Sequence, residues 1–475
     1  MGKLRVLLPA LIVIILIISA SLTIINAVNS ASESSPKAEA TENQIPLEFM
    51  SWNVSKKPPL EFYDELIHTL AKRYPKLVKV YSIGRSWRER DIWCIEMTSN
   101  VKNKEEKVGI AIIGNIHGGE WESGLAAAYT AWWFAVNYEY NLTARKILDN
   151  YILYIIPILN PDGYNQGIRE NLRPIDHNDD GIPYGDPYYD VNGDGVISMI
   201  YTGAPDSTPE ERKFLGYESL DFDNNGIPGD DPKRGIDLNR NFNYMWWRYD
   251  ADTGLGCKYA NAGPFPASEP EVQAIQRFLL THPVWALATL HTGEQSVLWP
   301  WCYSPEPTQD HEFMSRVAMQ MAKAMSDVTG RGYYYKQSYY DYPTAAELID
   351  WSYGRLHIHS YTVELYAPGT KPRWPPETSF GKLTVWGNEI PPDNWTYIGH
   401  WLKWDNVWFR TRGYALIRDV APPDLELMLK GWVEAAIVMI MSEPSGPGPQ
   451  IPEYISWYDM PCSTCCNTTY VKSKV

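Results

Sequence analysis

Short apolar runs alternate with longer segments of helical spacing along most of the chain. The apolar runs have the length of buried strands and cover residues 78–83, 92–97, 108–113, 152–158, 284–291 and 356–365. Helical spacing occurs in residues 60–74, 124–136, 269–281, 310–327 and 424–441, and a turn with a short helix is expected at 342–350. Strands that alternate with long helices predict an α/β fold built on a sheet.

Both ends of the chain depart from this pattern. Residues 6–28 are apolar and uncharged and follow Lys3 and Arg5, as in a secretory signal or an N-terminal membrane anchor. We divide the chain into a signal or anchor at 1–31, a polar linker at 32–45, a globular domain at 46–442 and a Pro/Gly-rich, then Cys-rich, tail at 443–475. The globular domain is therefore expected outside the cytoplasm, either secreted or anchored to the outer face of the membrane.

Residues 169–234 form an acidic insertion that holds three similar loops. Oxygen ligands at positions 1, 3 and 5 with Gly at position 6 are typical of calcium loops. The second loop has Tyr201 where an EF-hand has its bidentate Glu, so complete EF-hands are not expected, and a metal-free acidic surface is the alternative. The candidate ligands of structural calcium are Asp176, Asn178, Asp180, Asp186, Asp190, Asn192, Asp194, Asp221, Asp223, Asn225, Asp230 and Asp231.

The composition excludes one class of function and leaves others open. The chain has 475 residues and a formal net charge of −15, which argues against nucleic acid as a partner because nucleic-acid binding needs a basic face. A hydrophobic content of 44% is enough for one large core or two modest ones. The six cysteines permit disulfides, but their connectivity does not follow from the sequence.

Candidate metal ligands lie where predicted strands end. His117 and Glu120 follow the apolar run 108–113, and His291 ends the run 284–291. In α/β sheets, ligands bind at the carboxyl ends of the strands. Imidazole nitrogen and carboxylate oxygen are zinc ligands. His-x-x-Glu alone is a weak signal, and both Glu122 and the pair His357 and His359 are rival ligands.

Several motifs follow one another along the chain in a fixed order. They are Ile83-Gly-Arg-Ser86, His117-Gly-Gly-Glu120, Asn160-Pro-Asp-Gly163, Asp237-Leu-Asn-Arg-Asn241, His291, Tyr342, Asp350-Trp-Ser-Tyr353 and Thr362-Val-Glu-Leu365. In these motifs and their order, the chain resembles the zinc carboxypeptidases of the carboxypeptidase A and B type. The resemblance covers roughly residues 60–367 and implies a three-layer α/β/α domain. It also implies a mixed, mostly parallel, twisted sheet of about eight strands flanked by helices.

The resemblance assigns a role to each candidate site residue. His117, Glu120 and His291 would hold one catalytic zinc ion, a two-His, one-Glu set that the carboxypeptidase A site is known to use. Glu364 would be the general base. Asn239 and Arg240 would bind the free C-terminal carboxylate of a peptide or protein substrate, and Tyr342 would close over it. Arg169 would stabilise the oxyanion, with Arg173 as the alternative, because the arginine motif of the family is altered here.

The expected specificity rests on two positions that resemble the substrate pocket of the family. Ile349 precedes Asp350-Trp351 and favours hydrophobic C-terminal residues, whereas the nearby Glu347 would admit Lys or Arg. We expect a hydrophobic preference with some breadth. Gly119 stands where the animal digestive enzymes carry a further substrate-binding Arg, so binding of upstream residues is expected to differ.

Two other functions remain compatible with the sequence. One is a related zinc amidohydrolase that cuts peptidoglycan stem peptides. The other is a catalytically dead, calcium-ordered surface protein on a peptidase scaffold. The complete zinc set, Glu364 and the Asn239-Arg240 pair disfavour the dead scaffold.

Overall fold

The computed structural model describes most of the globular region of the chain. The described residues are 57–103, 107–176, 181–183, 185–186, 189–193, 197–221, 224–226, 235–248, 262–366, 368–369, 384–385, 388–389, 393–411 and 425–443. They belong to one compact unit, residues 49–475. The predicted segments 1–31 and 32–45, and all of the predicted tail except Glu443, lie outside the described residues. Within these ranges, no helix has the length and apolarity needed to cross a bilayer.

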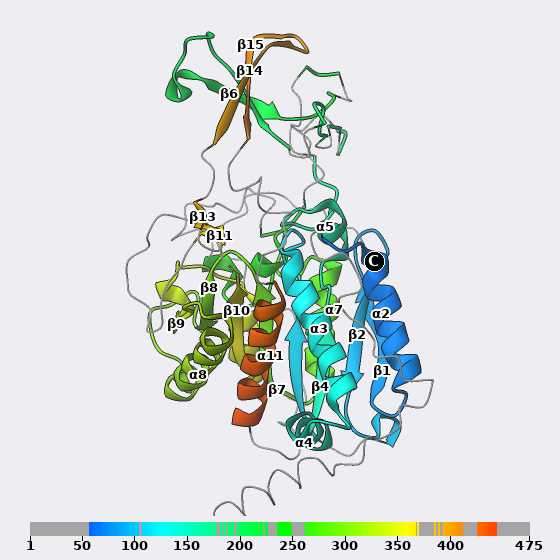
Figure 1. Ribbon diagram of the computed structural model, residues 1–475. Coiled ribbons are helices and arrows are strands. Elements are labelled where there is room, and N and C mark those ends of the chain that lie inside the picture. Colours follow the sequence, from blue (N-terminus) through cyan, green and yellow to red (C-terminus); the bar gives the residue numbers. More distant parts are fainter. Residues whose placement is uncertain are drawn as a thin grey trace, which may run out of the picture. The chain divides into compact units, whose positions relative to one another are not determined.

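A mixed sheet of eight strands forms the centre of this unit (Figure 1). The strands lie in the order β1 (Val78–Arg85), β2 (Asp91–Met97), β4 (Tyr151–Ile156), β3 (Val108–Ile113), β7 (Val284–His291), β10 (His359–Leu365), β8 (Gln295–Trp299) and β9 (Tyr334–Gln337). The pairs β3–β4, β3–β7, β7–β10 and β8–β9 are parallel, and the other three are antiparallel. The predicted α/β class and eight-stranded mixed sheet are confirmed.

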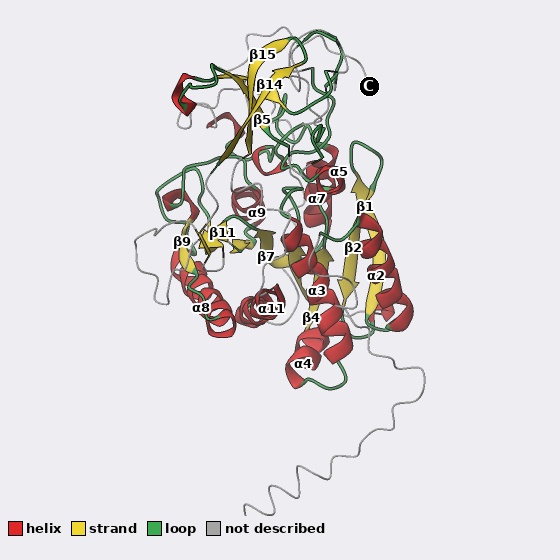
Figure 2. Ribbon diagram, turned by 45° about the horizontal axis from the view of Figure 1, so that its top comes forward, coloured by secondary structure: helices red, strands yellow, loops and turns green. Residues whose placement is uncertain are grey.

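Helices cover both faces of the sheet (Figure 2). One face packs against α7 (Pro270–Thr281) and α9 (Leu348–Leu356), whose apolar side chains share a core with the sheet. The other side holds α2 (Leu60–Arg73), α3 (Trp121–Asn137), α4 (Leu142–Asn150), α8 (His311–Thr329) and α11 (Leu425–Ser442). Shorter helices are α5 (Pro161–Gln166), η1 (Val101–Asn103), η2 (Pro209–Glu211), η3 (Leu238–Arg240), η4 (Trp246–Arg248) and η5 (Ser338–Tyr340).

The apolar pattern explains where these elements form. Every residue of β3 and β4 is buried, as expected for central strands covered on both faces. In α2, the buried residues Tyr63, Leu66, Ile67 and Leu70 recur at helical spacing and form one apolar stripe. The stripe and the buried strands together fix which face of α2 turns toward the sheet.

A second sheet was not anticipated from the sequence. The Trp-rich part of the chain after the predicted strand 356–365 contains the hairpin of β14 (Asn394–Trp401) and β15 (Trp404–Thr411). The hairpin pairs with β5 (Met199–Thr202) and β6 (Lys213–Tyr217) of the acidic insertion. Ile200, Val407 and Phe409 form the buried apolar side of this sheet. A third, small sheet contains β11 (Pro368–Gly369), β12 (Thr384–Val385) and β13 (Asn388–Glu389).

A buried acidic pair anchors the loop after α5 to the start of α7. Glu269 accepts hydrogen bonds from Trp87 Nε1 at 2.7 Å and Asn171 Nδ2 at 2.8 Å, and it pairs with Arg173 at 2.8 Å. Glu271 accepts from the Trp87 amide at 3.2 Å and from Asn171 Nδ2 at 3.1 Å. Burial raises the pKa of Glu271 to about 8, and the neighbouring Glu269 adds to that rise. Glu271 is therefore protonated at neutral pH.

The raised pKa of Glu271 predicts a pH-dependent stability. Between about pH 4.5 and pH 8 the folded chain keeps a proton that the unfolded chain has released, so this group's contribution to the free energy of unfolding falls as pH rises. Glu271→Gln does not titrate and brings only a constant offset from its amide contacts. We expect the melting temperature of the wild type to fall relative to Glu271→Gln by several degrees from pH 5 to pH 8. If the melting temperatures of the wild type and Glu271→Gln changed with pH in parallel, the protonated state of Glu271 would be contradicted.

Candidate active site

The candidate ligands come together at the carboxyl ends of neighbouring parallel strands. His117 lies in the turn after β3, and His291 is the last residue of β7. Glu364 lies in β10 and pairs in register with His291. The strands β3, β7 and β10 are adjacent in the sheet, so three distant parts of the chain meet at one edge.

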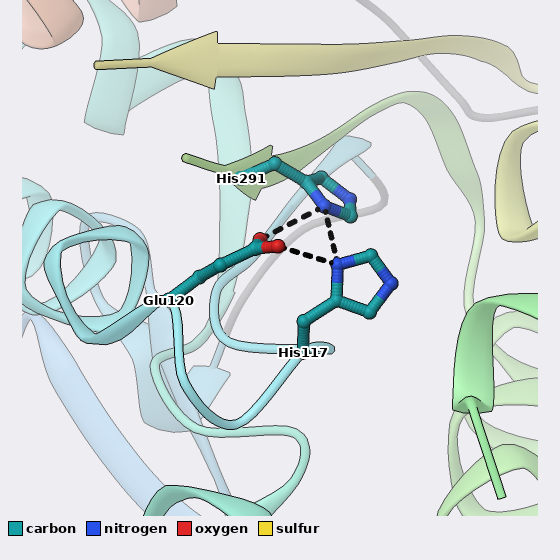
Figure 3. Close-up of side chains that lie close together, drawn as sticks. All are labelled: His117, Glu120 and His291. Carbon is teal, nitrogen blue, oxygen red and sulfur yellow. Dashed lines mark hydrogen bonds and ion pairs between the residues drawn. The ribbon is translucent and has the colours of Figure 1, made fainter. Parts of the chain in front are cut away.

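His117, Glu120 and His291 point their polar atoms at one another (Figure 3). Nδ1 of His117 lies 2.8 Å from one Glu120 oxygen, and Nδ1 of His291 lies 3.2 Å from the other. The two Nδ1 atoms are 3.1 Å apart, and all three side chains are buried. Within the described ranges, no other set of three His, Cys, Asp or Glu ligands converges in this way. Two imidazoles and one carboxylate fit a catalytic zinc ion and leave a coordination position for water.

The charge state of these residues suits a cation. Burial alone would raise the pKa of Glu120, but the imidazoles of His117 and His291 outweigh it and hold the pKa of that carboxyl well below its usual range. Burial works against the charged form of His117, yet the Glu120 and Asp237 carboxylates prevail and raise its pKa. The site therefore sets the carboxylates of Glu120 and Asp237 beside His117, and a divalent cation would take the place of the proton that this imidazole attracts.

The turn that carries His117 is held by hydrogen bonds from a buried side chain and by close backbone packing. The Asn115 side chain donates to the carbonyls of His117, Gly118 and Glu120 at 3.1 to 3.2 Å. A Cβ at Gly118 would lie 2.1 Å from the carbonyl carbon of Gly163, so only glycine lets the turn approach the first turn of α5 this closely. These contacts fix the direction of both ligands before any metal binds.

Asp237 is a site residue whose role our sequence reasoning missed, although it lies in a motif that we used. Its Oδ1 lies 3.3 Å from His117 Nε2, and its Oδ2 accepts from Arg169 Nε at 2.7 Å. A carboxylate behind a metal-binding histidine orients the imidazole ring and fixes which nitrogen faces the metal. The separation of 120 residues explains why the sequence gave no sign of this contact.

The surroundings of Glu364 bring the pKa of its carboxyl group close to neutral pH. Its Oε2 accepts from the Glu294 amide at 3.3 Å. Burial raises its pKa to about 8; His291 opposes that rise, whereas the Glu120 and Glu294 carboxylates add to it. A divalent cation at the neighbouring ligands would lower this pKa again. A group with these properties is suited to take up and release a proton at neutral pH.

Asn239, Arg240, Tyr342 and Glu347 form one hydrogen-bonded cluster, which we call the clamp. Arg240 Nη1 pairs with Glu347 Oε1 at 3.0 Å, and Arg240 Nη2 donates to the Tyr342 hydroxyl at 3.2 Å. Asn239 Nδ2 donates to Glu347 Oε2 at 3.4 Å. Arg240 and Glu347 are each 5% exposed, whereas Tyr342 is 54% exposed. Tyr342 therefore covers a buried ion pair from the solvent side.

The two candidate oxyanion arginines lie in different surroundings. Arg169 Nη1 lies 3.6 Å from Glu120 Oε1, and Arg169 Nε pairs with Asp237 next to the candidate zinc ligands. Arg173 pairs with the buried Glu269, and its guanidinium stacks 5.2 Å from the Trp87 ring centre. Only Arg169 is in contact with the zinc-ligand set.

The remaining predicted residues have more varied positions. Ile349 lies in the first turn of α9 and is fully buried in the same core cluster as Phe242 and Trp351. The rival ligand His359 binds Glu443 at 2.8 Å and lies outside the convergent set, and His357 is close to Asp310 instead. The rival Glu122 is buried and accepts from Thr292 Oγ1 at 3.5 Å.

The predicted calcium ligands lie only partly within the described residues. Asn178, Asp180, Asp194, Asp223, Asp230 and Asp231 lie outside them. Asp186 is buried, while Asp190 and Asn192 are not. Asp176, Asp221 and Asn225 are also described, and no three of the four described aspartates converge as the candidate zinc ligands do.

Comparison with known proteins identifies the family. The profile of the zinc carboxypeptidase family matches residues 63–384. Rat (Rattus norvegicus) carboxypeptidase B2 is 22% identical over 374 residues, covering 72% of this chain and 76% of the relative. Bovine (Bos taurus) carboxypeptidase O is 26% identical over 339 residues, covering 70% and 76%.

Solved structures share the fold. Thrombin activatable fibrinolysis inhibitor superimposes with a TM-score of 0.56 at 18% identity, covering 83% of this chain and 76% of that one. Carboxypeptidase A from Helicoverpa armigera gives a TM-score of 0.52 at 17% identity, covering 90% and 80%. The chain belongs to the zinc carboxypeptidase family and is a peptide hydrolase.

Proposed function

We propose that this protein is an active zinc carboxypeptidase that removes the C-terminal residue from peptides or proteins outside the cytoplasm. The convergence of His117, Glu120 and His291 next to Glu364 supports this most directly. When bound, zinc supplies a Lewis acid that polarises a carbonyl group and lowers the pKa of water to about 7. The ligand set, its burial and its negative charge fit that ion.

The protein's own residues supply proton transfer and charge stabilisation. Glu364 accepts the proton of the attacking water and passes it to the leaving amine. A cation held by the neighbouring ligands would lower the raised pKa of Glu364 and keep its carboxylate free to take that proton. Arg169 donates to the oxygen of the scissile carbonyl as negative charge develops there. Its proximity to Glu120 supports this role and disfavours Arg173, which is engaged with Glu269.

The clamp restricts the reaction to chain ends. Arg240 is a planar fork of donors that matches a terminal carboxylate, and Asn239 presents an amide beside it. Tyr342, whose hydroxyl touches Arg240 from an exposed position, covers the bound residue. A peptide without a free C-terminal carboxylate has nothing to offer this guanidinium, so internal bonds are poor substrates.

The activity is tested with a panel of blocked peptides, the same peptides amidated at the C-terminus, and muropeptides. We expect hydrolysis of the free acids only, with loss of activity after chelation and recovery with zinc. Glu364→Gln should keep its zinc but lose at least about 100-fold in kcat, since it removes the general base.

Three outcomes would contradict this proposal. Turnover by Glu364→Gln would refute the assigned base. Cleavage of muropeptides alone would favour the peptidoglycan amidohydrolase, and a zinc-loaded protein that cleaves nothing would favour the dead scaffold.

Structural calcium in the insertion remains a second part of the proposal. Two loops have the turn that such sites use, because Asp176 accepts from the Gly181 amide at 2.6 Å and Asp221 from the Gly226 amide at 3.1 Å. These bonds join the first and sixth loop positions. We expect EGTA to lower the melting temperature and calcium, but not magnesium, to restore it. An unchanged melting temperature would contradict structural calcium.

The location of the protein rests on its N-terminal segment. The uncharged apolar residues 6–28 support export, with secretion or anchoring through an uncleaved segment as the two forms.

A further inference from the structure

One asparagine side chain joins the two ends of the acidic insertion 169–234. Asn171 Oδ1 accepts from the Ile236 amide at 2.8 Å and from the Arg173 amide at 3.2 Å. The Asn171 amide also donates to the Ile236 carbonyl at 2.9 Å, although the two residues are 65 positions apart. The insertion therefore begins and ends at one set of hydrogen bonds among Asn171, Arg173 and Ile236, which we call the insertion joint.

The same side chain fastens the insertion joint to α7. Asn171 Nδ2 donates to Glu269 Oε2 at 2.8 Å and to Glu271 Oε2 at 3.1 Å, where that helix begins. Asn171 is fully buried, and its side chain uses both of its donors and both of its acceptor positions. A substitution that removes this amide would leave two buried backbone amides and two buried carboxyl groups without a partner.

Two residues of the candidate active site lie beside the insertion joint. Arg169 precedes Asn171 by two residues, and Asp237 directly follows Ile236. Arg169 Nε donates to Asp237 Oδ2 at 2.7 Å, and Asp237 Oδ1 lies 3.3 Å from His117 Nε2. The insertion joint therefore sets the backbone positions from which the side chains of Arg169 and Asp237 meet.

The clamp is held by other contacts, although it follows Asp237 in the sequence. The Leu348 amide donates to Asn239 Oδ1 at 3.0 Å, and Arg240 pairs with Glu347 at 3.0 Å. Both partners lie at the start of α9, not of α7. A change in the insertion joint should therefore displace Arg169 and Asp237 more than the groups that would bind the terminal carboxylate of a substrate.

We propose that Asn171 is a positioning residue for the reaction, because it holds Arg169 and Asp237 in the geometry that catalysis uses. This role rests on the proposed carboxypeptidase activity. Arg169 acts on charge that develops in the transition state, so its displacement lowers kcat and leaves substrate binding largely intact. A displacement of about 1 Å in such a group can lower the rate about 100-fold.

The test compares two substitutions in one buried network, each in the zinc-loaded, full-length protein. Asn171→Ala removes the insertion joint, whereas Trp87→Phe removes only the bond from Trp87 Nε1 to Glu269 at 2.7 Å. We expect both variants to have a lower melting temperature. Only Asn171→Ala should lose kcat, by about 10- to 100-fold, with KM changed by less than about twofold and its zinc retained. A phosphonate analogue of the substrate, which mimics the charge of the transition state, should lose affinity in parallel with kcat.

Three results would overturn the inference: an unchanged kcat in Asn171→Ala, a loss confined to KM, or an equal loss of kcat in Trp87→Phe. If Asn171→Ala does not fold, Gly235→Ala takes its place, because its Cβ would collide with Asn171 Oδ1 and displace that side chain. A normal kcat in Gly235→Ala would then overturn the inference. These results leave the carboxypeptidase activity standing, whereas a zinc-loaded wild type that cleaves no peptide would refute the proposed function together with the inference.

Discussion

The burial of charge at the ends of three parallel strands is the constraint on which the site depends. His117, Glu120 and His291 place their polar atoms within hydrogen-bond distance of one another, and each side chain is almost completely covered. An ionised carboxylate in such a place is costly unless cations surround it. The arrangement is consistent with a protein that has evolved around a bound metal ion, whose charge balances the cluster.

The pairing of opposite charges continues beyond the candidate metal ligands. Asp237 lies between His117 and Arg169. Burial alone would raise the pKa of Asp237, but Arg169 and His117 outweigh burial and hold that pKa well below its usual range. Arg240 is compensated by Glu347 in the neighbouring clamp. The site thus consists of alternating acidic and basic side chains. Each residue with a proposed catalytic or binding role has a neighbour of opposite charge. Removing one member therefore disturbs the others, so effects of single substitutions are not expected to add.

The local pattern of apolar and polar residues predicted most of the central fold. The bounds of β3 and β7 agree with the predicted runs because both strands are mainly apolar and are followed by polar turns. The start of β10 was placed three residues early, because His357 ends α9 in a left-handed conformation that the apolar pattern does not show. The hairpin of β14 and β15 escaped prediction because its partner β5 lies some two hundred residues earlier and has only four residues.

Within the site, the sequence indicated which residue types to expect but not their partners. The order of the motifs indicated the candidate zinc ligands and Glu364. Their positions at the ends of predicted strands indicated that they would lie close together. The pairing of Arg240 with Glu347 joins residues 107 positions apart, and no local pattern encodes it.

The most direct test of the central claim is the zinc content of the purified, folded protein after dialysis against zinc and removal of the excess. The account predicts one zinc ion per chain, and far less in Glu120→Ala, which keeps the fold but loses the carboxylate ligand. A folded wild-type protein that retains no zinc, or retains as much in Glu120→Ala, would contradict it.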